Sequence, residues 1–368
     1  MDPVVVVGGG IAGPAVALAL HRAGIAAEVY EAQPRGDGDA GAFLTLATNG
    51  MLALAALGVA ESVAAVGFPL RRLRLLDATG TQVHAGPMGR DGDLTRYRCL
   101  RRAELAEVLR AEVTRRGIPL YHGARLASVR DDGTGVTAAF RDGRTVRGRL
   151  LVGADGANST VRAAVAPDAV PEYAGQQVFY GYTRSAPPLP GPDTFHMIRG
   201  TGAAFGCATS PAGETYWFAR VTGPSVRYGR ADLLPLLRAD RTPAAGIVAG
   251  TDDVMVTDAR ELPPGMPWWA GRTLLVGDAA HVAAPATGQG ASMAVEDAVI
   301  LAKSLRDTTD PGAALTTYER YRRPRTAYNI LASGRMTRGL PPEGTAPVGD
   351  EELARQLDWH VPLRGRQP

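Results

Sequence analysis

Residues 4–13 read Val-Val-Val-Val-Gly-Gly-Gly-Ile-Ala-Gly, an apolar run that ends in a cluster of glycines. Four consecutive apolar residues predict a buried strand, and Gly-x-Gly-x-x-Gly after such a strand is typical of a turn that binds a dinucleotide. Gly8 permits the tight turn, Gly10 allows a pyrophosphate to approach the backbone, and Gly13 allows the following helix to pack closely. The stretch therefore predicts the first βα turn of a Rossmann-type domain.

The residues that follow continue this pattern. Pro14–Ala23 predicts a helix that ends at Gly24, and Ala27–Glu31 predicts a second strand. Glu31 ends this strand 18 residues after Gly13, near the spacing of about 20 at which an acid binds the ribose of a dinucleotide. The alternative is a structural glycine turn with a surface glutamate, but strand, helix and acid together favour adenine-dinucleotide binding.

Two later segments each join an apolar strand to a polar turn. Residues 150–162 read Leu-Leu-Val-Gly-Ala-Asp-Gly-Ala-Asn-Ser-Thr-Val-Arg, where the local alternative is an Asx turn that caps a helix at Ser159. Residues 274–292 run from Leu-Leu-Val-Gly-Asp to Gly-Gln-Gly-Ala-Ser, and here the alternative is that Asp278 merely caps a surface helix. Because glycine weakens a helix interior, the two glycines that open the following helix predict close approach of a ligand.

The composition is that of an ordinary globular chain rather than of a nucleic-acid or membrane protein. The chain has 368 residues and a net charge of +3; its arginines are scattered among acids, and Lys303 is the only lysine. Cys99 and Cys207 match no metal or redox spacing, and no segment reaches about 18 uninterrupted apolar residues. We expect a cytoplasmic protein, monomeric or homodimeric, without bound metal and without nucleic-acid or membrane partners.

The pattern changes between about residues 173 and 262, where aromatic residues and Gly/Pro turns predict an antiparallel sheet inserted into the first domain. The predicted division of the chain is a dinucleotide-binding domain over 1–70, 98–172 and 263–340, a substrate domain over 71–97 and 173–262, and an irregular tail over 341–368.

Taken together, the three glycine-containing segments resemble the fingerprints of the FAD-dependent aromatic hydroxylase family, the single-component flavoprotein monooxygenases related to para-hydroxybenzoate hydroxylase and salicylate hydroxylase. Gly8–Gly13 with Glu31 resembles the family's ADP-binding motif, residues 155–162 its Asp-Gly motif, and Gly277-Asp278 its Gly-Asp motif. The resemblance covers residues 4–305. It implies an α/β fold, with a Rossmann-type FAD-binding domain like that of para-hydroxybenzoate hydroxylase, an inserted antiparallel β-sheet substrate domain and C-terminal helices.

The resemblance also implies which residues bind FAD non-covalently. Asp278 would hold the ribityl chain, Pro285 would lie against the flavin ring, and residues 288–292 would direct backbone N–H groups at its N1–C2=O edge. Arg102 begins a segment similar to the family's Arg-x-x-Leu helix start, and residues 41–44 fall where the family has a mobile flavin-contacting loop. The expected cofactor-binding residues are Gly8, Gly10, Ile11, Ala12, Gly13, Glu31, Ala32, Arg35, Ala42, Phe43, Arg102, Leu126, Asp155, Arg162, Asp278, Pro285, Gly288, Gln289, Gly290, Ala291 and Ser292.

The chemistry that the resemblance implies is hydroxylation. NADPH or NADH would reduce FAD, O2 would give a flavin C4a-hydroperoxide, and one oxygen atom would pass to a phenolic or polycyclic aromatic small molecule. The alternatives are an FAD-dependent epoxidase or reductase acting on an alkene and, from another class, a redox-silent FAD-binding protein. The complete Asp155–Arg162 segment argues against the silent alternative, because the family uses it for both FAD and nicotinamide binding.

The sequence departs from the family at several places. The family often has arginine directly after its ribose-binding acid, whereas here Ala32 and Gln33 precede Arg35. The urate-hydroxylase branch has a substrate arginine shortly before its aromatic strand, where this chain has Ala203-Ala204, which argues against urate. The pair Trp268-Trp269 lacks the surrounding pattern and the lysine of flavin halogenases, so that function is rejected.

Substrate-site residues are expected in the inserted sheet, although core packing is the favoured role for each one alone. The candidates are Tyr180, Tyr182, His196, Phe205 and Tyr216. A buried tyrosine or histidine could orient or deprotonate a phenolic substrate. No catalytic side chain is identified, since the flavin would carry the chemistry.

Several other polar residues are expected to be structural. His281 has no catalytic partner beside it, so a structural hydrogen bond is expected. Glu296-Asp297 lies early in a helix and is expected to complement the helix dipole and to pair at the surface. Arg98 and Arg220 are candidate anchors for an anionic substrate, but a solvated surface position is favoured for both.

Overall fold

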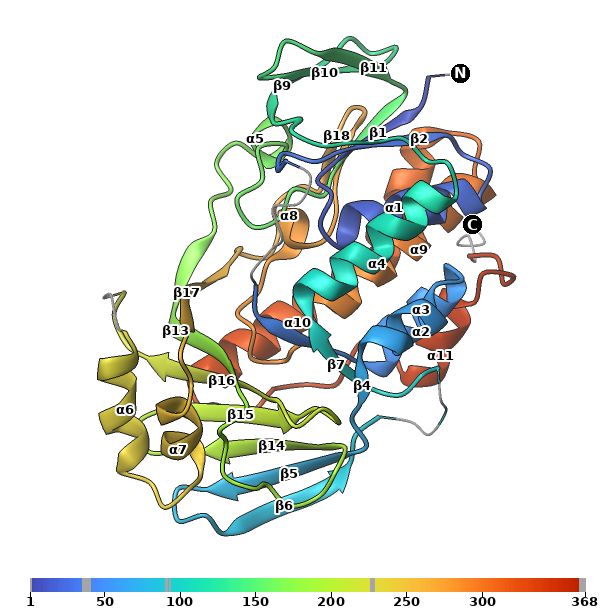
Figure 1. Ribbon diagram of the computed structural model, residues 1–368. Coiled ribbons are helices and arrows are strands. Elements are labelled where there is room, and N and C mark those ends of the chain that lie inside the picture. Colours follow the sequence, from blue (N-terminus) through green and yellow to red (C-terminus); the bar gives the residue numbers. More distant parts are fainter. Residues whose placement is uncertain (1, 35–40, 90–91, 93, 226–228, 364–368) are drawn as a thin grey trace.

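Strand β1 (Val4–Val7) lies at the centre of a six-stranded sheet in the computed structural model (Figure 1). Its four valines are buried, and the strand pairs in parallel with β12 along one edge and with β2 along the other. A continuous apolar strand is what a central parallel position requires. The structure describes residues 2–34, 41–89, 92, 94–225 and 229–363.

The six-stranded sheet is parallel except at one edge, where β18 runs antiparallel to β19. Its strands are, in spatial order, β18 (Trp269–Ala270), β19 (Thr273–Leu275), β12 (Leu150–Gly153), β1 (Val4–Val7), β2 (Ala27–Tyr30) and β8 (Leu120–Tyr121). From β1 the chain goes first to β2 on one side and later to β12 on the other. The carboxyl ends of β1 and β12 therefore flank a topological switch point, where open α/β sheets bind their ligands.

The helices of this domain agree with the α/β prediction, and three of them begin within a few residues of the helix starts expected near Pro14, at Arg102 and after the glycines 288 and 290. They are α1 (Ala12–Arg22), α2 (Thr48–Ala56), α3 (Ala60–Val66), α4 (Arg102–Arg115), α5 (Arg162–Val165), α8 (Asp278–His281), α9 (Gly290–Asp307) and α10 (Pro311–Thr337). Helix α9 packs against α1, α2 and α10. This packing places the start of α9 beside the glycine turn that opens α1.

One further helix corrects the sequence-based prediction for the C-terminal tail. Residues 341–368 were expected to be irregular, but α11 (Asp350–Leu357) forms within them and packs against α2 and α9. Its Leu353 and Leu357 are buried in the same core as the six-stranded sheet. The apolar side chains of this short helix thus pack into the core of the first domain.

Two small sheets complete the first domain. One is an antiparallel β-meander, β9 (Leu126–Asp131), β10 (Val136–Phe140) and β11 (Thr145–Gly148). The other consists of β3 (Phe43–Leu46), β7 (Arg98–Arg101) and β4 (Phe68–Pro69). Strand β3 begins within residues 41–44, where a flavin-contacting loop was expected, and β7 leads directly into α4.

The second domain is a seven-stranded sheet, drawn below the first domain in Figure 1. In spatial order its strands are β17 (Val254–Glu261), β13 (Glu172–Thr183), β16 (Thr215–Thr222), β15 (Ala204–Thr209), β14 (Thr194–Arg199), β5 (Arg72–Asp77) and β6 (Gln82–Pro87). The inserted strands β13 to β17 pair antiparallel, as predicted, and β5 joins the sheet beside β14 in parallel. That β5 and β6 join this sheet supports the predicted domain division, whose boundaries stay a prediction.

One face of the seven-stranded sheet is covered by two helices that the sequence patterns did not indicate, α6 (Arg230–Arg238) and α7 (Ala244–Ala249). Leu233 and Ile247 from these helices pack against Phe205 and Trp217 of the sheet. The opposite face carries Phe195 and Tyr216, which cluster with Phe43 of the first domain. The sheet therefore presents that face to the first domain.

Candidate active site

A large cavity lies between the two domains. Its volume is about 1810 Å³, and it is lined by residues that follow β1, β2 and β12, by the start of α9 and by the seven-stranded sheet. Cavities for drug-sized molecules measure roughly 300–1000 Å³. This cavity is large enough for a dinucleotide and a second small molecule together.

The glycine turn after β1 has three different local requirements. Gly8 has φ of +111°, and a Cβ there would lie 2.4 Å from the carbonyl oxygen of Ala154. A Cβ on Gly13 would lie 1.8 Å from the carbonyl oxygen of Gly8, so α1 packs on the turn as predicted. Gly10 lines the cavity, and a Cβ there would meet no atom within 4 Å. The chain itself requires Gly8 and Gly13, whereas Gly10 leaves open space for a ligand.

The start of α1 is suited to an anion. Ile11 and Ala12 line the cavity, no side chain caps the helix, and its first turn contains no acid. Unbonded N–H groups and the helix dipole give such an end partial positive charge. This is the arrangement that binds phosphates at helix N-termini.

Glu31, at the end of β2, also lines the cavity. Its carboxylate accepts hydrogen bonds from the backbone N–H groups of Gly9 and Gln33, the latter at 2.7 Å. These bonds hold the acid beside the glycine turn. Ala32 lines the cavity as well, whereas the predicted Arg35 lies outside the described residues.

The Asp-Gly segment after β12 is held together by its own hydrogen bonds. Asp155 lines the cavity, and its carboxylate accepts from the Ser159 hydroxyl and from the backbone N–H groups of Thr160 and Val161, at 2.7 and 3.1 Å. A local hydrogen-bonded loop is therefore present, but its backbone bonds reach residues five and six positions on, unlike an Asx turn, and α5 has its N-cap at Val161 rather than Ser159. It coexists with the exposure of the same aspartate to the cavity.

Arg162 does not lie where a cofactor contact would require. It is 4% exposed and is absent from the described lining of the cavity. Its guanidinium donates to the backbone carbonyls of Ala157, Ala169 and Ala279, at 2.6, 3.0 and 3.1 Å. The position indicates an arginine that joins the Asp-Gly segment to α8 behind the cavity wall.

The Gly-Asp motif lies where β19 passes into α8. Gly277 has φ of +58°, and a Cβ there would lie 3.1 Å from the Cβ of Ala12, so the motif packs closely against the start of α1. Asp278, the next residue, lines the cavity. The close packing explains the glycine and places the Gly-Asp motif beside the start of α1.

The start of α9 forms another part of the wall. Pro285, Gly288, Gln289, Gly290 and Ala291 line the cavity, and α9 begins without a side-chain cap and without an acid in its first turn. This second uncapped helix end also offers N–H groups and partial positive charge to a ligand. Among the predicted residues of this stretch, Ser292 is instead fully buried, and its hydroxyl accepts from the Ala47 N–H at 3.1 Å.

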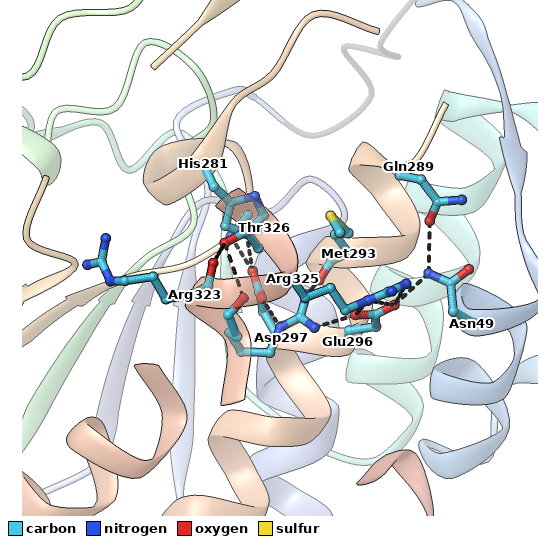
Figure 2. A network of polar contacts seen from close by, with 11 residues as sticks. Asn49, His281, Gln289, Met293, Glu296, Asp297, Arg323, Arg325 and Thr326 are labelled. Atoms are coloured by element: carbon cyan, nitrogen blue, oxygen red, sulfur yellow. Dashed lines mark hydrogen bonds and ion pairs between the residues drawn. The ribbon is translucent and has the colours of Figure 1, made fainter. Parts of the chain in front are cut away.

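Two acids inside α9 were expected at the surface, and that prediction was wrong. Glu296 and Asp297 are completely buried. Arg322 of α10 bonds to both carboxylates, through Nη1 to Glu296 and through Nε to Asp297 at 2.7 Å. Arg325 adds a bond to Glu296 at 2.8 Å (Figure 2). Burial would raise the pKa of the Asp297 carboxyl, but His281 and Arg322 lower it to about 2. Both acids are therefore ionised within a paired network.

This network reaches the cavity wall at two points. Asn49 of α2 donates from Nδ2 to Glu296 and to the side-chain oxygen of Gln289 at 2.9 Å, as Figure 2 shows. Asp297 bonds His281 Nε2 at 2.6 Å and accepts from the backbone N–H of Gly277 at 2.8 Å. The structural hydrogen bond expected for His281 is confirmed, and the network holds both the Gly-Asp motif and the start of α9.

The remaining predicted residues near the first domain, Ala42, Phe43, Arg102 and Leu126, all line the cavity. Arg110 was missed; it lines the cavity from α4 and donates to the Gly9 carbonyl at 3.2 Å. The arginine lies two helical turns after Arg102, a spacing that brings both toward one side of α4. That periodicity is the signal that could have identified it.

The sheet side of the cavity follows strand alternation. The lining residues of the seven-stranded sheet are Leu73, Val178, Tyr180, Phe195, Met197, Phe218 and Arg220. Successive side chains of a strand point to opposite faces, and cross-strand partners point to the same face. Tyr180, paired with Phe218, is the predicted substrate candidate that this face brings to the cavity. Burial raises its pKa to about 12, which favours a neutral hydroxyl.

Four other candidates are placed elsewhere. Phe205 stacks on Trp217 in the core beneath α6 and α7, and His196 is the register partner of Cys207 in that same core. Because side chains alternate along a strand, both lie on the face of the sheet that is turned away from the cavity. That face packs against α6 and α7. They are therefore not substrate contacts in the described structure.

Tyr182 and Tyr216 lie on the correct face but belong to a packed cluster. Their rings meet edge-on with centroids 4.9 Å apart, and the Arg101 guanidinium lies 4.1 Å from the Tyr182 centroid. The Tyr182 hydroxyl donates to the Gly41 carbonyl at 3.1 Å. The pair joins the sheet to the segment before β3, and neither is among the described residues that line the cavity.

Among the described residues, no helix is long and apolar enough to cross a membrane, and no cluster of histidines, cysteines and acids has the arrangement of a metal site.

Comparison with known proteins gives consistent results. The model of a family described as FAD binding domain matches residues 1–332. Aurachin C monooxygenase/isomerase from Stigmatella aurantiaca is 33% identical over 344 residues, which cover 90% of this chain and 88% of that protein. FAD-dependent urate hydroxylase from Klebsiella pneumoniae is 32% identical over 335 residues, which cover 86% and 85%. The crystal structure of Klebsiella pneumoniae HpxO complexed with FAD and uric acid is similar with a TM-score of 0.81 at 27% identity, covering 98% of this chain and 93% of that one.

Proposed function

Because the chain belongs to the FAD binding domain family and is an FAD-dependent monooxygenase, we propose that it hydroxylates a small aromatic molecule with NAD(P)H and O2 as co-substrates. The observation that carries this proposal is a large cavity whose one end is lined by the glycine and acid motifs and whose other end is lined by an aromatic sheet face. Cofactor and substrate would thus share one cavity.

The cavity wall supports FAD as the group that occupies the first end. The uncapped start of α1 would bind the pyrophosphate, and Glu31 and Asp278 offer carboxylate oxygens to ribose and ribityl hydroxyls. The uncapped start of α9 would stabilise negative charge at the flavin edge without a lysine. Bound FAD supplies electron transfer from NAD(P)H and the activation of O2.

The sheet end supports a flat, apolar substrate. Phe195, Met197 and Phe218 present ring faces and a thioether, which pack well against an aromatic ring. Tyr180 adds a hydroxyl whose raised pKa keeps it a hydrogen-bond donor at neutral pH. These side chains would orient the ring and exclude water from the reacting groups.

The proposal is tested by reduction and product analysis. The purified flavoprotein is mixed anaerobically with NADPH or NADH, alone and with each of a panel of phenols, and the decay of flavin absorption is followed. We expect at least one phenol to accelerate the decay, and isotopically labelled O2 then to place one labelled atom in the product. Mass and fragmentation distinguish a hydroxylated ring from an epoxide or a reduced alkene. Reduction that no aromatic accelerates, or a product without the label, contradicts the proposal.

A further inference from the structure

Arg220, in β16, differs from the other residues that line the sheet end of the cavity. It is the one charged side chain among the described residues of the seven-stranded sheet that line this space. The residue is only 6% exposed, so the favoured expectation of a solvated position was wrong. Its guanidinium carbon lies 5.3 Å from the centroid of the Phe218 ring.

Two nitrogens of the Arg220 guanidinium are buried without a hydrogen-bond acceptor among the described residues. Its Nε and Nη1 have no partner in the described part of the chain. Two other buried arginines are fully engaged: Arg162 donates to three carbonyls, and Arg322 to Glu296 and Asp297. The same fold therefore satisfies buried guanidinium groups where their role is structural.

An unpaired buried cation lowers stability, because desolvation of its donors is not compensated. Burial lowers the pKa of Arg220 and the nearby Tyr180 raises it, but a guanidinium stays protonated at neutral pH. The aromatic contact with Phe218 offsets only part of this cost. An anionic oxygen of a bound ligand would supply the hydrogen-bond acceptor and the opposite charge that this guanidinium lacks.

We propose that Arg220 binds an anionic oxygen of the substrate, and that the substrate is therefore an aromatic acid or an acidic phenol bound as its anion. The inference rests on the proposed function, whose substrate class it defines. A guanidinium forms short, charge-assisted hydrogen bonds to carboxylate or phenolate oxygens. Phe195 and Phe218 would hold the ring while Arg220 fixes the position of its charged substituent.

Equilibrium titration of the oxidised holoenzyme tests the proposal without turnover. The probes are two matched pairs, 3-hydroxybenzoate with 3-hydroxybenzamide and pentafluorophenol with pentafluoroanisole, and binding is read from the perturbation of flavin absorption. We expect the wild type to bind at least one anion about tenfold or more tightly than its neutral partner. The pair that responds distinguishes a carboxylate from a phenolate.

Variants then assign the preference to the residue. Arg220→Met should abolish the preference and Arg220→Lys should retain part of it, whereas Arg199→Met, which removes an exposed arginine of the same sheet, should change nothing. FAD content should be normal in all three. Since Arg220→Met removes an unpaired buried charge, its melting temperature should be unchanged or higher.

Two kinds of result overturn the proposal. One is a wild type that binds neither anion more tightly than its neutral partner, or a preference that survives in Arg220→Met. The other is a clear loss of stability or FAD in Arg220→Met, which would make the arginine structural. If the protein preferred the anions but was not reduced by NAD(P)H, the proposed function would be refuted and the anion site at Arg220 would stand. If it was reduced but showed no anion preference, the proposed function would stand and the anion site would be refuted.

Discussion

Single residues in the glycine turn separate what the fold needs from what a ligand needs. Gly13 faces a carbonyl at 1.8 Å from its missing Cβ, while Gly10 faces open cavity. The sequence motif predicts a packing role for Gly13 and a ligand contact for Gly10. The structure shows that a Cβ on Gly13 would clash with the chain, and the role of Gly10 toward the cofactor stays a prediction.

Gly10→Ala and Gly13→Ala form a matched pair of variants. Gly10→Ala should fold with nearly wild-type stability but bind FAD more weakly, because its methyl group would occupy the space next to the pyrophosphate. Gly13→Ala should be strongly destabilised, because α1 would have to move away from Gly8. Thermal unfolding of the apoproteins and FAD titration measure the two effects. Equal stability of the two apoproteins would contradict this separation.

Arg162 was expected at the cofactor, but in the structure its guanidinium bonds three backbone carbonyls, which favours a structural role. Arg162→Met would leave three backbone carbonyls without their donor, at about 1–3 kcal/mol for each buried group left unsatisfied. We expect a less stable protein with reduced FAD content, measured by denaturant unfolding and by flavin absorption. Arg184→Met, which removes an exposed arginine bonded to the Ala212 carbonyl, is the control and should be nearly neutral. If Arg162→Met had wild-type stability, the structural role would be contradicted and a direct contact of Arg162 with the cofactor would be favoured.

At the scale of elements, strand alternation decides which side chains meet the cavity. From the sequence, the aromatic residues of the insertion were all equal candidates. Once the register pairs Tyr180 with Phe218, the residues 178, 180 and 220 share one face, and Phe205 and Trp217 share the other. The register depends on contacts between distant strands, which local patterns do not contain.

The helices α8, α9 and α10 are joined by the buried acids, and Asp297 tests that connection. Asp297→Asn removes one charge from a paired network and should lower the free energy of unfolding by about 3–5 kcal/mol. It should also weaken FAD binding, since the Asp297 carboxylate accepts from the N–H of Gly277. Glu343→Gln breaks the exposed pair with Arg335 and should cost about 0–1 kcal/mol.

The stability difference between wild type and Asp297→Asn should also depend on pH. The Asp297 carboxyl has a pKa near 3.8 in its ordinary state and about 2 in the folded protein. Because the folded pKa is depressed, its stabilisation is fully present above the ordinary value and is lost as the pH falls toward the folded one. The difference in unfolding free energy between wild type and Asp297→Asn should therefore narrow as the pH falls from about 4 to about 2. A difference that stays constant over this range would show that charge is not the cause.

At the scale of the whole molecule, the sequence predicted the domain types, most helices and the motifs that surround the cofactor end of the cavity. These rest on local signals: apolar runs, glycine turns and helical periodicity. What it did not predict depends on partners far along the chain. The acids of α9 become core residues only because Arg322 and Arg325 reach them from α10. The helix in the tail is stabilised because α11 packs against α2 and α9.

The C-terminal tail is anchored to the first domain by contacts of Trp359 and Lys303. Trp359 is buried between the guanidinium groups of Arg22 and Arg306, which lie 4.9 and 5.0 Å from its ring. Lys303 of α9 donates to the carbonyls of Gln356 and Asp358, both at 2.6 Å. A buried ammonium that relies on the tail for its acceptors ties the order of α11 to the stability of α9.

Trp359→Ala should therefore lower the free energy of unfolding by about 3–5 kcal/mol, the usual cost of truncating a buried tryptophan. His360→Ala, at the exposed neighbouring position, should stay within about 0.5 kcal/mol of wild type. Denaturant unfolding measures both, and FAD affinity of the folded variants should be unchanged because Trp359 does not line the cavity. If both variants unfolded at the wild-type midpoint, the tail would be an independent appendage and α9 would be stable without it.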